Sequence, residues 1–243
     1  MADMDVDEAS FALVCGANES SQLAERCDAD AVLRPMYAPL PSGVQLITAV
    51  AFGLCHAVWL TSEGQVLTIG LNDNGQCGVK AGADDCLRTP VRLEALSTKR
   101  ATGASAGGAH TAVVTDEGEL ITFGASDYGQ CGHGEGAPIN GYKPRVVRAM
   151  RAALDVACGS EHTLVLDACA AVWACGHGAS GALGLGDLDS RAAPAPLDAL
   201  VAAPIRQVAA GERHSLALTF AGAVFAWGSR RDGALGLPTT LGA

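Results

Sequence analysis

The sequence has few aromatic residues and few charged ones. Aromatic residues make up 5% of its 243 residues and charged residues 17%, whereas hydrophobic residues make up 49%. A chain with this balance can bury a core, which excludes an intrinsically disordered protein. Because aromatic side chains are scarce, we expect small and β-branched aliphatic residues to fill that core.

Positive charge is also scarce. The chain has 16 Lys and Arg against 26 Asp and Glu, a formal net charge of −10. Nucleic acids and anionic membranes attract clustered positive charge, so neither is expected as a direct partner. The densest basic cluster contains Lys143, Arg145, Arg148 and Arg151. We interpret it as a solvated surface run offset by nearby acids, with a partner-binding patch as the alternative.

Paired cysteines and targeting segments are lacking. The nine cysteines are odd in number and include no C-x-x-C pair, so the sequence indicates no disulfide framework, no metal site and no cofactor. Residues 1–9 are acidic, unlike a signal or transit peptide, and are predicted to form a tail. The longest apolar stretch, 46–60, is too short to span a membrane. We expect an intracellular protein, cytoplasmic or nuclear.

Glycine, in contrast, is abundant, with 30 residues, and it recurs in register with histidine. Four histidines lie 54, 52 and 52 residues apart, at His56, His110, His162 and His214. One glycine stands three residues before each histidine and another fourteen after it: Gly53, Gly107, Gly159 and Gly211, then Gly70, Gly124, Gly176 and Gly228. A proline stands 34 residues after the first three histidines, at Pro90, Pro144 and Pro196. This register indicates an internal repeat of roughly 50 residues.

Each repeat contains short strands separated by turns. The residues after each histidine, such as 163–166, are apolar on both faces, which indicates a strand covered on both sides. Glycines such as Gly64 and Gly118 supply hairpin turns, and Ala170 replaces this glycine in the third repeat. Because alanine is close to glycine in size, this departure puts little in doubt about the repeat. About four strands in each repeat predict the blade of a β-propeller.

The repeat resembles the RCC1 repeat, named for the regulator of chromosome condensation. The resemblance rests on V-A-A-G-x-x-H-S-L-A-L-T, G-x-V-F-A-W-G and G-x-L-G within 207–237, and it covers 11–237. Cys77 and Cys131 depart from it, because they replace the usual leucine of the G-Q-L-G sequence. The resemblance implies an all-β propeller of four-stranded blades.

About four and a half blades are predicted, within one domain over 10–243. This domain contains a half repeat (10–45) and four repeats, at about 46–98, 99–151, 152–203 and 204–243. Seven blades, the usual number in this family, would need about 360 residues. We therefore expect a fragment, a truncated product, or an open arc whose terminal blades a partner covers.

The twelve repeat glycines and histidines named above are predicted to be structural. Each imidazole is expected to bond backbone in a tight turn, far from its copies, and metal ligation or base catalysis is the alternative. The segment 176–181 matches G-x-G-x-x-G, but two of its glycines belong to the repeat, so a dinucleotide site is not indicated. No catalytic residue is predicted, and Cys15 and Cys175, which occupy equivalent strand positions, are interpreted as buried hydrophobic residues.

These observations favour a non-catalytic module that binds a protein partner. The loops at 80–88 and 133–142 are the candidate binding segments. The resemblance implies an alternative, a guanine nucleotide exchange factor for a Ran-type small GTPase, although the even spacing leaves no room for the founding member's extra β-wedge. A photoreceptor role, as in the family's plant ultraviolet receptor, needs clustered tryptophans, and this chain has only Trp59, Trp173 and Trp227.

Overall fold

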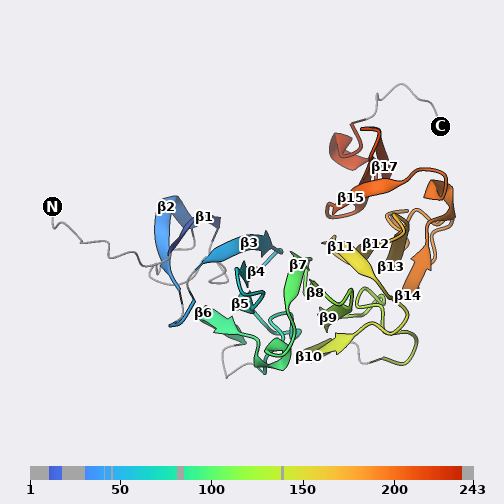
Figure 1. Ribbon diagram of the computed structural model, residues 1–243. Coiled ribbons are helices and arrows are strands. Elements are labelled where there is room, and N and C mark those ends of the chain that lie inside the picture. The colour runs from blue at the N-terminus through green and yellow to red at the C-terminus, as the bar shows by residue number, and fades with distance from the viewer. Residues whose placement is uncertain are drawn as a thin grey trace.

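The structure is a computed structural model that describes residues 11–17, 31–40, 42–44, 46–80, 85–137 and 140–236. Strands make up most of these residues, and their sheets stand side by side along an arc (Figure 1). The predicted acidic tail at 1–9 lies outside the described residues, as do parts of the two candidate loops.

Three sheets are antiparallel meanders of four strands each. Blade 1 contains β3 (Ile47–Phe52), β4 (His56–Thr61), β5 (Val66–Leu71) and β6 (Cys86–Arg92). Blade 2 contains β7 (Ala101–Ala106), β8 (His110–Thr115), β9 (Leu120–Ala125) and β10 (Asn140–Val146). Blade 3 contains β11 (Ala153–Cys158), β12 (His162–Asp167), β13 (Val172–Gly176) and β14 (Arg191–Pro196).

Two smaller sheets lie at the ends of the arc (Figure 1). At one end β1 (Phe11–Ala17) pairs with β2 (Ala31–Pro39). At the other end blade 4 contains β15 (Ile205–Ala210), β16 (His214–Thr219) and β17 (Val224–Gly228). The helices of the described residues are three short 3-10 turns: η1 (Glu94–Leu96), η2 (Asp198–Leu200) and η3 (Arg231–Gly233). The predicted all-β blades are confirmed.

The second and third strands of every blade share one register. His56 pairs with Gly70, and the equivalent histidine and glycine pair in blades 2, 3 and 4. Gly70 has a φ of 108°, and a Cβ there would lie 2.5 Å from the carbonyl oxygen of Cys55. Glycine ends this strand because the backbone conformation and the space both exclude a side chain.

The outer strand joins each blade through a bulge. In blade 1 Thr68 pairs with Val91 and Gly70 pairs with Leu87, so four residues of β6 span two residues of β5. The same shift occurs between β9 and β10 and between β13 and β14. Because the shift is the same, outer-strand residues of different blades can be matched one to one.

This matching corrects one predicted repeat position. In blade 3 Ala195 pairs with Ala174, so Pro194 takes the place of Pro90 in blade 1. The assignment of Pro196 as the repeat proline is wrong, because the connection that leads to β14 is two residues shorter than its counterparts.

The hairpin turn of blade 3 has an alanine where the other blades have glycine. Ala170 has a φ of 63°, close to the 76° of Gly64 and the 74° of Gly118 at the same position. The side chain is small, as predicted, but its Cβ is forced into the left-handed region that alanine disfavours. The replacement keeps the hairpin turn of the repeat and strains its backbone.

The hydrophobic core lies between neighbouring blades. Blade 1 contributes Val58, Leu60 and Val66, and blade 2 contributes Val113, Ile121 and Phe123. Similar clusters join blade 2 to blade 3 and blade 3 to blade 4. Because the second and third strands of blades 2 and 3 have a blade on both sides, their residues are apolar without alternation, as the sequence indicates.

Candidate functional site

The repeat histidines link each blade to the next. His56 Nε2 lies 2.8 Å from the hydroxyl of Thr111, the first residue after the histidine of blade 2. His110 makes the same contact with Thr163 at 2.8 Å, and His162 with Ser215 at 2.9 Å. The predicted bond to backbone in a turn is wrong in this respect, because the imidazole bonds a side chain of the following blade.

The hydroxyl fixes the protonation state of each ring. Thr111 donates its hydroxyl proton to the carbonyl oxygen of Gln76 at 2.8 Å, so it can only accept from His56, whose Nε2 must carry a proton. Burial lowers the pKa of His56 to about 4 and that of His110 to about 3. The charges of His56 and His162 lower the pKa of His110 further. Neighbouring copies therefore lie closer together than the sequence predicted.

The glycine before each histidine lets the blades approach along the inner edge. A Cβ on Gly107 would lie 2.4 Å from His110 Cε1 and 2.5 Å from the carbonyl oxygen of Gly159 in the next blade. The amide of Leu54 donates to the carbonyl of Gly107 at 3.1 Å, which joins the backbones of blades 1 and 2. These contacts support a structural role for the repeat positions.

The histidine–hydroxyl contacts, which we call the ladder, all run in one direction, from the histidine of one blade to the hydroxyl of the following blade. The residue that should accept from a preceding histidine is Ala57 in blade 1, which has no hydroxyl. At the other end, His214 has no hydroxyl partner within the described residues, and Val224 nearby on the outward face of blade 4 is 64% exposed. Equivalent positions of the inner interfaces, such as Val172, are buried.

Four of the described cysteines, including Cys175, are buried, whereas Cys169 is exposed and Cys15 lies outside the described side chains. Cys77, Cys131, Cys158 and Cys175 are buried, and burial raises the pKa of the Cys131 thiol to about 12. Such thiols are not nucleophiles at neutral pH. Within the described residues, no three His, Cys, Asp or Glu side chains gather as metal ligands would. In the same part of the chain, no helix combines the length and apolarity needed to cross a bilayer.

Blade 2 has basic residues at positions where blades 1 and 3 have none, although β6 has Arg88 and Arg92 and β14 has Arg191 at other positions. Register matches Lys143 with Thr89 and Ala193, and Arg145 with Val91 and Ala195. Two further basic residues follow on the same connection: Arg148 matches Glu94 and Asp198, and Arg151 matches Ser97 and Val201. The basic cluster is therefore a property of one blade and not of the repeat.

The connection that carries Arg148 is two residues shorter than its counterparts in blades 1 and 3, and its backbone differs from theirs. Glu94 and Asp198 begin the short helices η1 and η2, where a carboxylate is favourable in the first turn. With Arg148 in this place, blade 2 has a turn and no assigned helix. Blade 2 therefore has a positive side chain at a position where blades 1 and 3 have a carboxylate.

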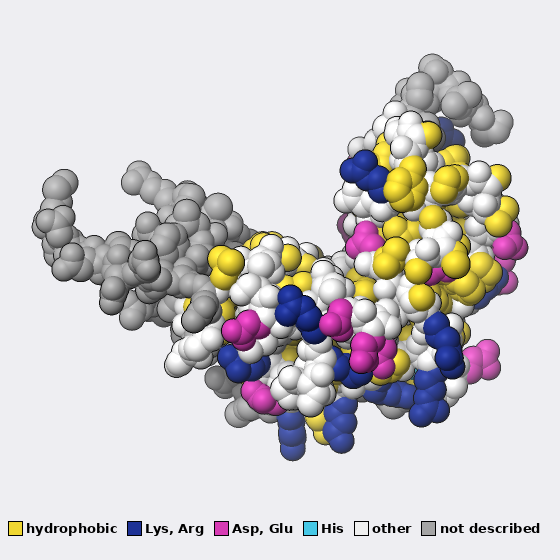
Figure 2. Space-filling model, in the orientation of Figure 1, with side chains coloured by type: hydrophobic (Ala, Val, Ile, Leu, Met, Phe, Trp, Pro, Cys, Tyr) yellow, Lys and Arg dark blue, Asp and Glu magenta, His cyan; other side chains and the backbone are white. Residues whose placement is uncertain are grey.

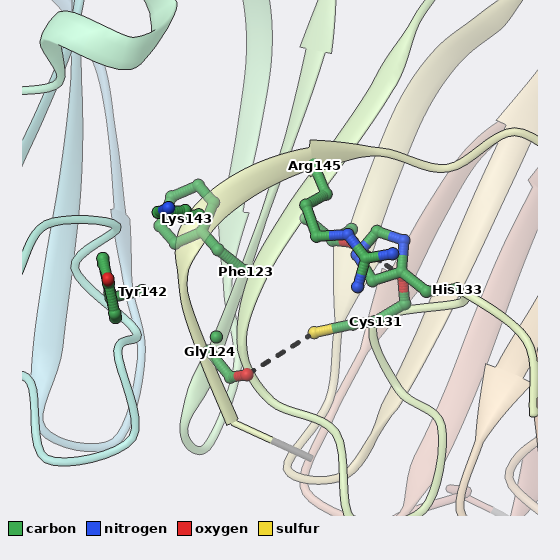
Figure 3. Close-up of a pocket in the computed structure, with 9 residues that line it drawn as sticks. Phe123, Gly124, Cys131, His133, Tyr142, Lys143 and Arg145 are labelled. Atoms are coloured by element: carbon green, nitrogen blue, oxygen red, sulfur yellow. Dashed lines mark hydrogen bonds between the residues drawn. The ribbon is translucent and has the colours of Figure 1, made fainter. Parts of the chain in front are cut away.

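Two hollows adjoin on this strand and share His133 and Arg145 as lining residues. The first, of about 360 Å³, is lined by Phe123 and Cys131 on one side and by Tyr142 and Lys143 on the other. The second, of about 660 Å³, adds Arg148 and small residues of blades 2 and 3. Figure 3 shows Arg145 reaching toward His133 above the first hollow. We call the two hollows together the blade 2 groove.

The basic side chains of the groove have no acidic partners among the described residues. Lys143, Arg145 and Arg148 are exposed, make no ion pair there, and meet no acidic residue in the lining of either hollow. Elsewhere Lys99 pairs with Glu119 and Arg191 with Asp187. Dark blue side chains gather along the lower edge in Figure 2, the edge of β6 and β10. The predicted offset by nearby acids is wrong for this cluster.

His133 is the groove residue that the sequence interpretation did not single out, beyond placing it at one end of a loop. Its Nε2 donates to the Thr122 hydroxyl at 3.0 Å, because that hydroxyl donates to the Cys131 carbonyl. Burial lowers the pKa of His133, and the charge of Arg145 lowers it further. Val79 and Leu185 stand in its place in blades 1 and 3, so aligning the repeats would have revealed it.

Comparisons with known proteins agree with this architecture. A family model described as an RCC1-like domain matches residues 11–242. The ultraviolet-B receptor UVR8 of Arabidopsis thaliana is 33% identical over 211 residues, 85% of this chain and 47% of the receptor. The mouse X-linked retinitis pigmentosa GTPase regulator is 39% identical over 136 residues, 55% of this chain and 13% of that protein.

Among solved structures, Prp20p of Saccharomyces cerevisiae matches with a TM-score of 0.77 and 24% identity, over 95% of this chain and 56% of that one. At this identity the match shows the fold alone. The chain spans about half the length of the plant receptor and of Prp20p.

Proposed function

Because the chain belongs to the RCC1-like domain family, we propose that it is a non-catalytic module that binds a protein partner through the blade 2 groove. Fold alone does not assign a partner, so the proposal must rest on a site. The observation that carries it is the placement of four basic residues on a single blade of a chain with a net charge of −10.

The differences between the blades support this proposal. The inner contacts recur with the same residue types in each blade, as structural positions do in repeat proteins. On the outer strand, Val91 and Ala195 show that an apolar or small residue suffices for the fold where blade 2 has Arg145. A charge that the fold does not require, left without an acidic partner, favours a role in binding.

The repeat residues do not favour catalysis. His56, His110 and His162 are buried and hydrogen-bonded across blades, and burial keeps them neutral near pH 7. The thiols of Cys77 and Cys158 have a pKa raised to about 12 by burial. General acid–base or thiolate chemistry needs groups that titrate near the working pH.

Affinity capture with a blade exchange variant tests the proposal. The variant gives the groove the residues of blade 1: His133→Val, Lys143→Thr, Arg145→Val, Arg148→Glu and Arg151→Ser. Because blade 1 folds with these residues, we expect an unchanged circular dichroism spectrum and the loss of a partner that the natural chain captures. Capture of the same partners by both proteins would refute the proposal.

A control of equal charge removes the effect of net charge. Arg206, Arg213, Arg230 and Arg231 are exposed basic residues of blade 4 and of the segment that follows it. Changing three to Ser and Arg230 to Glu alters the net charge as much as the blade exchange does. We expect this control to capture the partner as the natural chain does.

The second candidate is regulation of a small GTPase. It is supported by the name of the mouse relative, a GTPase regulator that is 39% identical over 136 residues. Release of a fluorescent GDP analogue from a Ran-type GTPase tests it. Acceleration at micromolar protein would favour this candidate, and unchanged release by the folded chain would exclude exchange activity toward that GTPase.

Localisation to the cytoplasm or nucleus stays a prediction, as do the repeat boundaries. Photoreception as in the plant relative is not proposed, because Trp59, Trp173 and Trp227 lie on three different blades.

A further inference from the structure

We propose that the blade 2 groove binds an extended acidic peptide segment of the partner, with one large apolar side chain in the first hollow and neighbouring carboxylates on Arg145 and Arg148. This inference rests on the proposed function and names the chemistry of its ligand. It follows from the shape, the lining and the charge of the two hollows.

The first hollow is suited to a single apolar side chain. Its volume of about 360 Å³ lies at the small end of ligand pockets. The ring of Tyr142, 43% exposed, supplies apolar surface, the almost fully buried Phe123 and Cys131 lie behind it in the lining, and Lys143 and Arg145 stand at its edge. A small polar ligand would leave this surface in contact with water, whereas an aromatic or branched aliphatic side chain would cover it.

Two positions that border the first hollow are apolar in blades 1 and 3 but polar in blade 2. Val79 and Val91 in blade 1, and Leu185 and Ala195 in blade 3, are the apolar residues that correspond to His133 and Arg145. An imidazole that is hydrogen-bonded to Thr122 and a charged guanidinium do not form the apolar contact that two aliphatic side chains can form. The space between the outer strand and the preceding loop is therefore open to a ligand.

The second hollow is suited to carboxylates. Arg145 and Arg148 line it, no acidic residue does, and its other walls are small residues such as Gly132, Ala149 and Ala193. Guanidinium groups bind carboxylates through paired hydrogen bonds, and small walls let an extended backbone approach them. Because Arg145 lines both hollows, the apolar side chain and the first carboxylate must be close together in the ligand.

His133 provides a readout inside the groove. Since the charge of Arg145 contributes to lowering its pKa, a carboxylate bound to Arg145 would offset that charge. Binding at this site should therefore raise the pKa of His133, and binding elsewhere on the chain should not.

A protein segment is favoured over a nucleic acid on grounds of charge. A chain in which 26 acidic residues stand against 16 basic ones, with a net charge of −10, repels a long polyanion. A short acidic segment needs only the local charge of the groove.

Fluorescence anisotropy with defined peptides tests the inference. The probe is a labelled peptide of about ten residues with one Phe flanked by Glu, compared with versions in which Phe becomes Ala or each Glu becomes Gln. We expect binding to weaken about tenfold or more for either change and for Arg145→Val in the protein. Arg206→Ser is the matched control and should leave binding unchanged.

Each other result would overturn the inference. Equal binding of the Phe and Ala peptides would show that no apolar side chain anchors the ligand. Equal binding of the peptide by the Arg145→Val variant and the natural chain would place the peptide elsewhere. Tighter binding of a single-stranded RNA of equal length would favour a nucleic acid. An unchanged pKa of His133, followed by NMR during titration with the probe, would also contradict it.

The outcome separates this inference from the proposed function. If the blade exchange variant loses its captured partner but the acidic peptide does not bind the natural chain, the groove binds a protein of other chemistry. If the blade exchange variant keeps the captured partner, both proposals fail.

Discussion

The inner strands and the outer strands of this propeller differ in what they repeat. Along the strands that begin with the repeat histidines, the imidazoles of blades 1, 2 and 3 each meet a hydroxyl of the next blade at 2.8–2.9 Å. Along the outer strands the backbone register repeats but the side chains do not, as Val91, Arg145 and Ala195 show. Positions where the same side-chain contact recurs hold the blades together. Positions where the side chain differs between blades are available for binding.

The largest expected effect is acid destabilisation of the inner ladder. The pKa values of His56, His110 and His162 are lowered by burial to about 4, 3 and 4 from an ordinary 6.5. Below pH 6.5 the unfolded chain therefore binds protons that the folded chain does not, so stability falls as pH falls toward 4. At pH 5 the loss is about 2 kcal/mol for each histidine, or about 6 kcal/mol together.

Urea denaturation at pH 7 and pH 5 measures this loss. His110→Gln is the comparison, because the amide can still donate to Thr163 but does not titrate. We expect this variant to lose about a third less stability between the two pH values than the natural chain loses. Equal losses would mean that the ladder histidines do not cause the acid sensitivity.

The next largest effect is expected at the inner glycines. Gly107→Ala would place a Cβ 2.5 Å from the carbonyl oxygen of Gly159, a backbone atom that cannot move aside cheaply. We expect a loss of about 3 kcal/mol, by thermal or urea denaturation. Gly103→Ala in the same strand is the control, since its Cβ would meet only Val114 at 3.9 Å. Equal losses for the two variants would contradict close packing of the inner edge.

A smaller effect is expected from one ladder hydroxyl. Thr163→Val keeps the shape but leaves the Nε2 proton of His110 and the carbonyl of Gln130 without their partner. The cost of such unpaired buried groups is about 2 kcal/mol. Thr163→Ser should restore most of this stability, and a Ser variant as unstable as the Val variant would assign the loss to packing.

Sequence reasoning was reliable for the inner strands, because repeated histidines and glycines report a contact that is made several times. Sequence reasoning was less reliable where a residue contacts another that is distant in the sequence. The hydroxyl partner of His56 lies 55 residues away, and no local pattern links the two. The two-residue shift that places Pro194 in register depends on strand pairing, which the sequence does not show.

The blade 2 groove could not be predicted from the sequence for a related reason. Arg145 and Arg148 were visible as a cluster, but whether acids pair with them depends on how blades 2 and 3 pack. His133 reaches them only because its loop lies beside β10. Comparing outer strands blade by blade, once their register is known, separates such residues from the repeat.

One inner position departs from the repeat and offers a stabilising change. Ala170 holds a φ of 63° where Gly64, Gly118 and Gly222 stand in the other blades. Ala170→Gly removes a strain of about 1 kcal/mol, part of which is lost again to the greater freedom of the unfolded chain. We expect a net gain of about 0.5 kcal/mol in urea denaturation. A loss would mean that the alanine side chain contributes packing in this turn.

The smallest effect on stability is expected on the outer strand, where Arg148→Glu gives blade 2 the residue of blade 1. The carboxylate suits the first turn that Glu94 begins in η1, so the change should be neutral or stabilising, by about 0.3 kcal/mol. The same substitution places a negative charge in the second hollow, and we expect it to weaken binding of the acidic peptide about tenfold. A large loss of stability would show that the outer strand, like the inner ones, is constrained by the fold. Unchanged stability with weakened binding would show that the two sides of the blade serve different purposes, since no inner position separates folding from binding in this way.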